Sequence, residues 1–128
     1  MSKKALIVTD ETEQVKKIAM YISDALAGFT VKICSADKFE GTDLLGADVF
    51  FLGCAQNSPS SFSYIEKMLK HINFASRKCA VFTTDLKTIN YLCSIVKDCE
   101  ASLGAPLHVV SKEPEKSALN NWVKSVIK

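Results

Sequence analysis

Short apolar runs alternate with amphipathic segments along this chain, and that alternation restricts the possible folds more than any other feature. The runs are rich in β-branched and aromatic residues and carry few charges, which is typical of strands buried on both faces. Five strands are expected, at residues 4–9, 29–34, 47–53, 78–84 and 107–110. Strands that alternate with helices in this way predict an α/β fold, a doubly wound parallel sheet with helices on both faces.

The segments between the strands have apolar residues at helical spacing. Helices are expected over residues 11–27, from a serine cap near Ser60, from Asp85 to Gly104, and over a final face formed by Leu119, Trp122, Val123 and Val126. Gly28 is suited to end the first of them, because glycine tolerates the left-handed conformation after a helix. Residues 35–46 are polar, and a loop with at most a short helix is expected there.

The turn between the first strand and the first helix is very short. Asp10 stands three residues before Glu13, a spacing close to that of a capping box, in which both side chains accept from backbone amides at the helix start. In open parallel sheets, ligands bind beyond the carboxyl ends of the strands. This turn therefore lies at the edge where a ligand is expected, although Asp10 and Glu11 are equally consistent with a plain helix cap.

Length and composition limit the possible functions. The 128 residues form a single expected domain, 1–128, with 48% hydrophobic and 23% charged residues, as in ordinary globular proteins. The formal charge of +2 is spread along the chain, so nucleic acid is not an expected partner. No run is long enough to cross a bilayer and the first residues do not read as a signal segment, so we expect a cytoplasmic protein with no membrane partner.

The common catalytic and nucleotide motifs are absent from the sequence. There is no phosphate-binding P-loop, no G-x-G-x-x-G after the first strand and no G-x-S-x-G elbow. His71 and His108 have no partner at a motif spacing, so no catalytic or metal role is expected for them. The cysteines form no C-x-x-C pair and read as small buried hydrophobes of a reducing compartment; they are Cys34, Cys54, Cys79, Cys93 and Cys99.

Four phrases of the sequence resemble the flavodoxin family. Residues 44–53 are similar to the third flavodoxin strand, 77–84 to the fourth, 12–15 to the start of the first helix and 121–123 to the last helix. The resemblance implies a flavodoxin-like sheet in the order 2-1-3-4-5. It further implies a non-enzymatic FMN-dependent electron carrier, a monomer or weak dimer that serves a redox partner protein.

The resemblance also implies where FMN would bind. Thr9 and Thr12 match hydroxyls of the flavodoxin phosphate loop, roughly T-x-T-G-x-T, which lies at a helix N-terminus. Residues in the place of the two loops that flank the flavin ring are Cys54, Ala55, Gln56, Asn57, Thr83, Thr84 and Asp85, and Tyr91 is a candidate to cover one face of the ring.

The phosphate loop of this chain departs from the flavodoxin pattern. The turn is shorter, lacks glycine and carries Asp10 and Glu11, so a phosphate dianion would meet like charge there. Two hypotheses follow: an atypical FMN-dependent carrier, and a flavodoxin-like interaction module without flavin.

Response-regulator receiver domains offer a third comparison. Asp10 with Glu11, Thr84 and Lys112 resemble three of the four receiver features, and carboxylates suit magnesium. Glycine, Gly53, stands where the phosphoacceptor aspartate is expected, and Glu113 separates Lys112 from the following proline. A degenerate receiver domain is therefore the weakest of the three hypotheses.

Overall fold

A parallel sheet forms the middle layer of the molecule. The computed structural model describes residues 3–38, 40, 42–43, 46–55, 60–71, 77–97, 99–104, 106–109 and 115–127. The strands lie side by side in the order β2 (Phe29–Ser35), β1 (Lys3–Thr9), β3 (Val49–Gly53) and β4 (Lys78–Thr83). All pairs are parallel, which confirms the predicted sheet and its order.

The fifth position of the sheet is divided between two short strands. Both β5 (Ser102–Leu103) and β6 (Leu107–His108) pair with β4, at its start and at its end respectively. The helix predicted after Asp85 is confirmed as α4 (Thr88–Lys97), but its predicted end at Gly104 is wrong, because Ser102 and Leu103 form β5. Glu100 adopts a positive φ of 61°, and the chain then runs beside β4, where the amide of Gly104 donates to the carbonyl of Cys79 at 2.9 Å.

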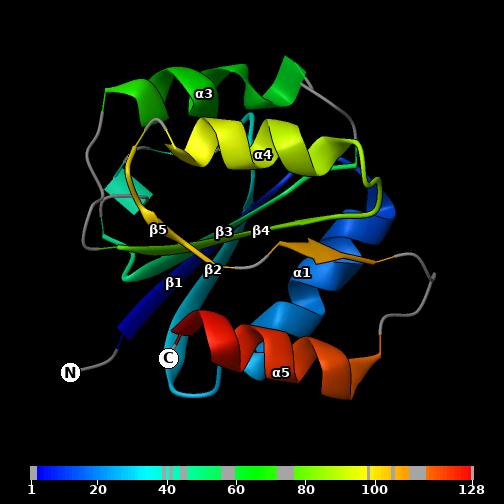
Figure 1. Cartoon of the computed structure of the whole chain (residues 1–128). Helices are drawn as coiled ribbons and strands as arrows, with labels where there is room; N and C mark the ends of the chain where they lie inside the picture. The colour runs from blue at the N-terminus through cyan, green and yellow to red at the C-terminus, as the bar shows by residue number, and fades with distance from the viewer. Residues whose placement is uncertain are drawn as a thin grey trace.

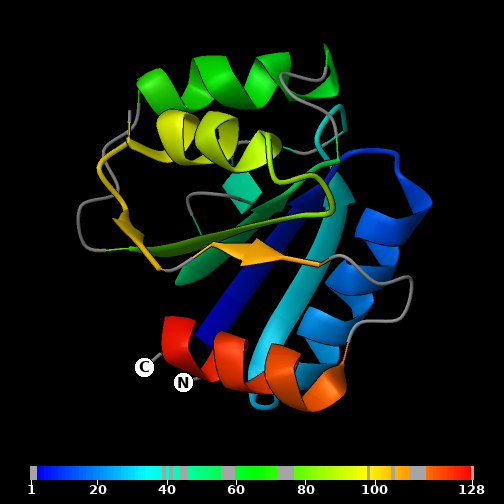
Figure 2. The same cartoon turned by 45° about the vertical axis from the view of Figure 1, so that its right-hand side comes forward.

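Two layers of helices cover the sheet, as Figures 1 and 2 show. Helices α1 (Glu13–Ala25) and α5 (Lys116–Ile127) cover one face, and α3 (Ser63–Lys70) and α4 cover the other. Helix α1 is shorter at both ends than predicted, and Gly28 has the expected positive φ of 88°. Ser60 is not the cap of α3, because a 3-10 turn, η1 (Ser60–Phe62), precedes it and Phe62 is its N-cap residue.

The core lies on both sides of the central strands because successive side chains of a strand point to opposite faces. Leu6 and Phe50 pack toward α3 and α4, whereas Ile7 and Phe51 pack toward α1 and α5. Every residue of β3 is buried, as the apolar run predicted. The predicted burial of the cysteines is confirmed for Cys54, Cys79 and Cys99, whereas Cys34 and Cys93 are only half-buried.

Strand β2 is the least covered strand of the sheet. It is an edge strand, and Thr30, Lys32 and Ile33 are exposed along it. In the connection from β2 to β3, the described residues include only a short helical stretch at Thr42 and Asp43. Among the described residues, this part of the β1 and β2 surface faces the helical stretch at Thr42 and Asp43.

Among the described residues, none of the helices combines the length and the apolar character that crossing a bilayer requires.

Candidate functional site at the carboxyl edge

Three sequence-distant turns meet at the carboxyl edge of the sheet. Thr9 of β1 pairs with Gly53 of β3, and Gly53 pairs with Phe82 of β4, so the residues that follow these strands are neighbours. A Cβ atom at Gly53 would lie 2.2 Å from the ring of Phe82, which is completely buried. Only glycine fits this close approach, and the edge is therefore tightly packed at its centre.

Asp10 joins the first two of these turns. Its side chain is 4% exposed, and its two carboxylate oxygens have different partners. Oδ1 accepts from the amide of Thr12 at 3.0 Å, and Oδ2 accepts from the amide of Ala55 at 2.8 Å. The backbone amide of Asp10 donates to the carbonyl of Gly53 at 3.1 Å. The carboxylate thus uses its hydrogen-bonding capacity to connect the β1 turn to the β3 loop.

The capping box predicted for Asp10 and Glu13 is wrong. Thr12 is the N-cap residue of α1, its side chain makes no capping hydrogen bond, and Glu13 is the first helical residue and not the third. Asp10 lies two residues before the cap, where it forms an Asx-type turn with Thr12. Its second hydrogen bond, to a residue 45 positions away, is a tertiary contact.

Glu11 behaves differently from its neighbour Asp10. It is exposed, and its carboxylate pairs with the ammonium of Lys16 at 3.2 Å. The hydrogen bonds from Lys16 and then Ser35, with the charge of Lys16, lower the pKa of Glu11. Glu11 therefore belongs to the solvent-facing side of the turn.

Thr88 adds a third connection that sequence reasoning missed. It is the first residue of α4 and completely buried, and its hydroxyl donates to the carbonyl of Ala55 at 3.4 Å. Both backbone polar groups of Ala55 are thereby held, one by Asp10 and one by Thr88. The only sequence signal was a hydroxyl residue at the start of a helix near this edge.

Thr83 and Asp85 satisfy each other within the loop after β4. The hydroxyl of Thr83 accepts from the amide of Asp85 and donates to its carbonyl, both at 3.0 Å. Thr83 is fully buried, and the carboxylate of Asp85 accepts from the amide of Lys87 at 3.0 Å. The hydroxyl of Thr83 thus already has both a donor and an acceptor inside the protein.

The structure brings most of the predicted site residues to this one edge. Thr9 is buried, Thr12 and Thr84 are half-buried, and Cys54 lies beneath the surface. Burial, and then the charge of Asp10, raise the pKa of Cys54 to about 12, so its thiol stays protonated near neutral pH. The predicted residues Gln56 and Asn57, and also Lys112, lie outside the described part of the chain.

Tyr91 packs between two helices. Its hydroxyl donates to Glu66 on α3, and its ring lies 6.4 Å from the ring of Phe62, centroid to centroid. Burial and the hydrogen bond to Glu66 raise its pKa well above the usual value. These contacts give Tyr91 a packing role at the α3–α4 interface.

The described residues of the edge supply neither a set of metal ligands nor an aspartate that could accept a phosphoryl group at the end of β3. Among the described residues, no group of three histidine, cysteine or carboxylate side chains is placed to hold a metal. The residue at the end of β3 is Gly53, and Cys54 follows it, so this strand end carries no acceptor carboxylate.

Comparison with known proteins gives a clear result for the fold. No protein-family model matches the chain, and no curated protein sequence matches it. Among solved structures, a short-chain flavodoxin associated with a non-canonical PDU bacterial microcompartment matches with a TM-score of 0.85 at 14% identity, over 99% of this chain and 97% of the other. The chain has a flavodoxin-like fold.

Two further flavodoxins support the same conclusion. Oxidised Flavodoxin 2 from Bacillus cereus matches with a TM-score of 0.84 at 19% identity, over 97% of each chain. A Fusobacterium nucleatum flavodoxin variant bound to flavin mononucleotide matches with a TM-score of 0.73 at 12% identity, over 99% of this chain and 96% of the other. These TM-scores show a flavodoxin-like architecture over nearly the whole chain. At identities this low, the matches support the fold alone.

The residues at the edge do not fit an FMN phosphate in the way that a flavodoxin phosphate loop would. Such a loop offers amides and hydroxyls to an anion. Here the buried carboxylate of Asp10 already accepts from the amides of Thr12 and Ala55. An incoming phosphate would compete with that carboxylate for donors and would be repelled by its charge.

Proposed function

We propose that this chain is a non-enzymatic, flavodoxin-like protein-interaction module that functions without FMN at the carboxyl edge. The observation that carries the proposal is the pair of hydrogen bonds from Thr12 and Ala55 to Asp10. Two like charges about 4 Å apart repel by about 1 kcal/mol in water and about 4 kcal/mol near a protein surface. Phosphate binding would therefore cost both this repulsion and the existing hydrogen bonds.

The loops that would flank the flavin ring support the same proposal. Ala55 is held from both sides by Asp10 and Thr88, and the hydroxyl of Thr83 is engaged by Asp85. Tyr91 is engaged by Glu66 and Phe62 at the interface of α3 and α4. An isoalloxazine ring would have to loosen contacts that the folded protein already makes.

Titration of FMN into the purified protein tests this proposal. Flavin fluorescence is followed while the protein concentration is raised, for the wild type, for Asp10→Gly and for Asp85→Asn. We expect no saturable quenching in the micromolar range for the wild type or for Asp85→Asn, whose carboxylate is exposed. Asp10→Gly, which frees the two amides and removes the charge, is expected to quench flavin fluorescence measurably.

Submicromolar binding of FMN to the wild type would overturn the proposal. NMR spectra of labelled protein, in which the amide chemical shifts of each variant are compared with those of the wild type, establish that each variant is folded. Unchanged weak binding in a folded Asp10→Gly variant would show that Asp10 is not what excludes the phosphate.

An FMN-dependent electron carrier is the second candidate, and the likeness to flavodoxins over the whole chain favours it. In that case Thr9 and Thr12 would donate to the phosphate, and a redox partner protein in the cytoplasm would receive the electron. A yellow preparation whose visible bands bleach and return on reduction and reoxidation would support this candidate. A colourless preparation that is again colourless after incubation with FMN and removal of the unbound flavin would exclude it.

A further inference from the structure

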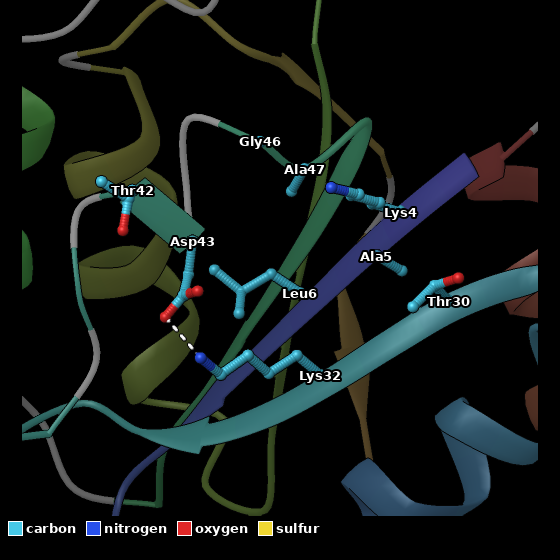
Figure 3. A pocket seen from close by; sticks show the side chains of 9 residues that line it. All are labelled: Lys4, Ala5, Leu6, Thr30, Lys32, Thr42, Asp43, Gly46 and Ala47. Carbon is cyan, nitrogen blue, oxygen red and sulfur yellow. Dashed lines mark hydrogen bonds and ion pairs between the residues drawn. The ribbon is translucent and has the colours of Figure 1, made fainter. Parts of the chain in front are cut away.

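A hollow lies away from the carboxyl edge, over the amino-terminal halves of β1 and β2. Its cavity volume is about 230 Å³, and Figure 3 shows the side chains that line it. Lys4 and Leu6 come from β1, Lys32 comes from β2, and Asp43 comes from the helical stretch in the connection between β2 and β3. Figure 3 also shows Lys4 pointing across the hollow toward Ala47.

Strand register explains why these side chains gather. Lys4 pairs with Thr30 and Leu6 pairs with Lys32, so their side chains project from the same face of the sheet. That is the face of α3 and α4, because Leu6 belongs to the core cluster beneath those helices. Of the described residues in the connection between β2 and β3, Thr42, Asp43 and Gly46 line the outer side of the hollow.

Hydrogen bonds hold the walls of the hollow in place. The amide of Lys4 donates to the Asp48 carboxylate at 2.8 Å, and the amide of Asp48 donates to the Lys4 carbonyl at 2.8 Å. The amide of Gly46 donates to the Thr42 carbonyl at 3.1 Å, and Arg77 donates to the Ala47 carbonyl. A ligand would therefore meet a largely preformed site, which lowers the entropic cost of binding.

The charges in the hollow do not cancel. The ammonium of Lys32 lies 2.8 Å from a carboxylate oxygen of Asp43, so these two charges neutralise each other. Within the described part of the chain, the ammonium of Lys4 takes part in no ion pair. The lining thus combines one ammonium that makes no ion pair, that of Lys4, with the side chain of Leu6 and the methyl group of Ala47; the nearby Asp48 carboxylate is bound to the backbone amide of Lys4 and not to its ammonium.

We propose that this hollow binds a small organic monoanion, a carboxylate with a short apolar body. The carboxylate would pair with Lys4, and the apolar body would lie against Leu6 and Ala47. A single ammonium without an ion pair suits a monoanion better than a dianion, since the carboxylates of Asp43 and Asp48 repel additional negative charge. The volume is below the roughly 300–1,000 Å³ of sites for drug-sized ligands, which restricts the ligand to a small molecule.

Sodium butyrate is the probe for this site, and butylammonium chloride is its cationic control of similar size. The amide chemical shifts of labelled protein are followed by NMR, at constant ionic strength, during each titration. We expect saturable shifts with butyrate, in the millimolar range, at Lys4, Leu6, Lys32 and Ala47. We expect no such shifts with butylammonium, because the same ammonium charge repels it.

Three variants make the assignment specific. Lys4→Met keeps the alkyl stem and removes the charge, and it should weaken butyrate binding about tenfold, the effect of one charge-assisted hydrogen bond. Asp43→Asn should instead tighten binding several-fold, because it leaves Lys32 uncompensated. Lys87→Met, at an exposed position in the loop after β4, should leave the affinity unchanged.

The Lys4→Met and Asp43→Asn variants are expected to change the affinity for butyrate in opposite directions, which makes the proposal falsifiable. Absence of saturable shifts, equal shifts with butyrate and butylammonium, or shifts confined to the carboxyl edge would each overturn it. So would Asp43→Asn weakening the binding as Lys4→Met does. This test does not depend on whether FMN binds, so the proposal and the proposed function can fail separately.

Discussion

The two ends of strand β1 carry opposite kinds of polar site. At the carboxyl end, both oxygens of the buried Asp10 carboxylate accept hydrogen bonds, one from the amide of Thr12 and one from that of Ala55. Nearer the amino end, Lys4 lies in an open hollow beside Leu6. At the carboxyl edge, the protein's own carboxylate thus occupies two backbone amides that an anion could use, whereas in the hollow the ammonium of Lys4 makes no ion pair with a described residue.

Replacing a glycine in each region should give the largest difference in the free energy of unfolding. Gly53→Ala at the edge should lower the free energy of unfolding by about 3 kcal/mol, because the added methyl group meets the buried ring of Phe82 at 2.2 Å. Gly46→Ala at the hollow should change it by less than about 0.5 kcal/mol, since its nearest neighbour is the Thr42 carbonyl at 3.4 Å. Urea denaturation measures both, and equal costs would contradict a packed edge.

Removing the charge of Asp10 should produce the next largest effect. Asp10→Asn keeps the shape but places an NH₂ group against one of two backbone donors, so we expect a loss of about 1–3 kcal/mol. Urea denaturation with Asp85→Asn as the exposed control measures this loss. An Asp10→Asn variant as stable as the control would show that the carboxylate does not hold the two turns together.

Thr88→Val should have a smaller effect on the same edge. It removes the hydroxyl that donates to Ala55 over 3.4 Å, and the expected cost is about 0.5–1 kcal/mol. In the double variant with Asp10→Asn, the two costs should not add, because both side chains hold Ala55. Strict additivity in a double-mutant cycle would mean that the edge is not one connected unit.

The smallest expected effect lies at the hollow, in the exposed Lys32–Asp43 pair. Its hydrogen bond lowers the pKa of Asp43 and raises that of Lys32. The contribution of Asp43 is present above its usual pKa near 3.8 and is lost as the pH falls through its lower folded value. The contribution of Lys32 is complete below 10.5 and is lost as the pH rises through its higher folded value.

A comparison of the wild type with Asp43→Asn tests this pH dependence. The difference in Tm should be small, should be greatest at neutral pH, and should shrink in both strong acid and strong base. A difference that persists below the pKa of Asp43 would show that the pair is not its cause.

The sequence predicts the strands of this molecule better than its site. The apolar runs of β1, β3 and β4 are local patterns, and each lies where it was expected. Leu103 also fitted a helical pattern, but pairing with Cys79 on β4 places it in a strand. Such edge pairing depends on distant parts of the chain, and local periodicity does not contain it.

The role of Asp10 was hidden for the same reason. Its spacing to Glu13 resembles a capping box, whereas its second partner, Ala55, is 45 residues away. Thr88 and Tyr91 also depend on tertiary neighbours, Ala55 for the first and Glu66 for the second. The sequence did not predict the hollow, because strand register is needed to bring Lys4 and Lys32 to the same face.

Scalar couplings across hydrogen bonds offer the most direct test of the claim that Asp10 fills the anion position of this fold. In labelled protein, the side-chain carboxyl carbon of Asp10 should couple to the amide nitrogens of both Thr12 and Ala55. Both couplings should persist when FMN is added in excess. Loss of these couplings on addition of FMN, with new amide shifts at Thr12 and Ala55, would contradict the account, because the phosphate would then have displaced the carboxylate.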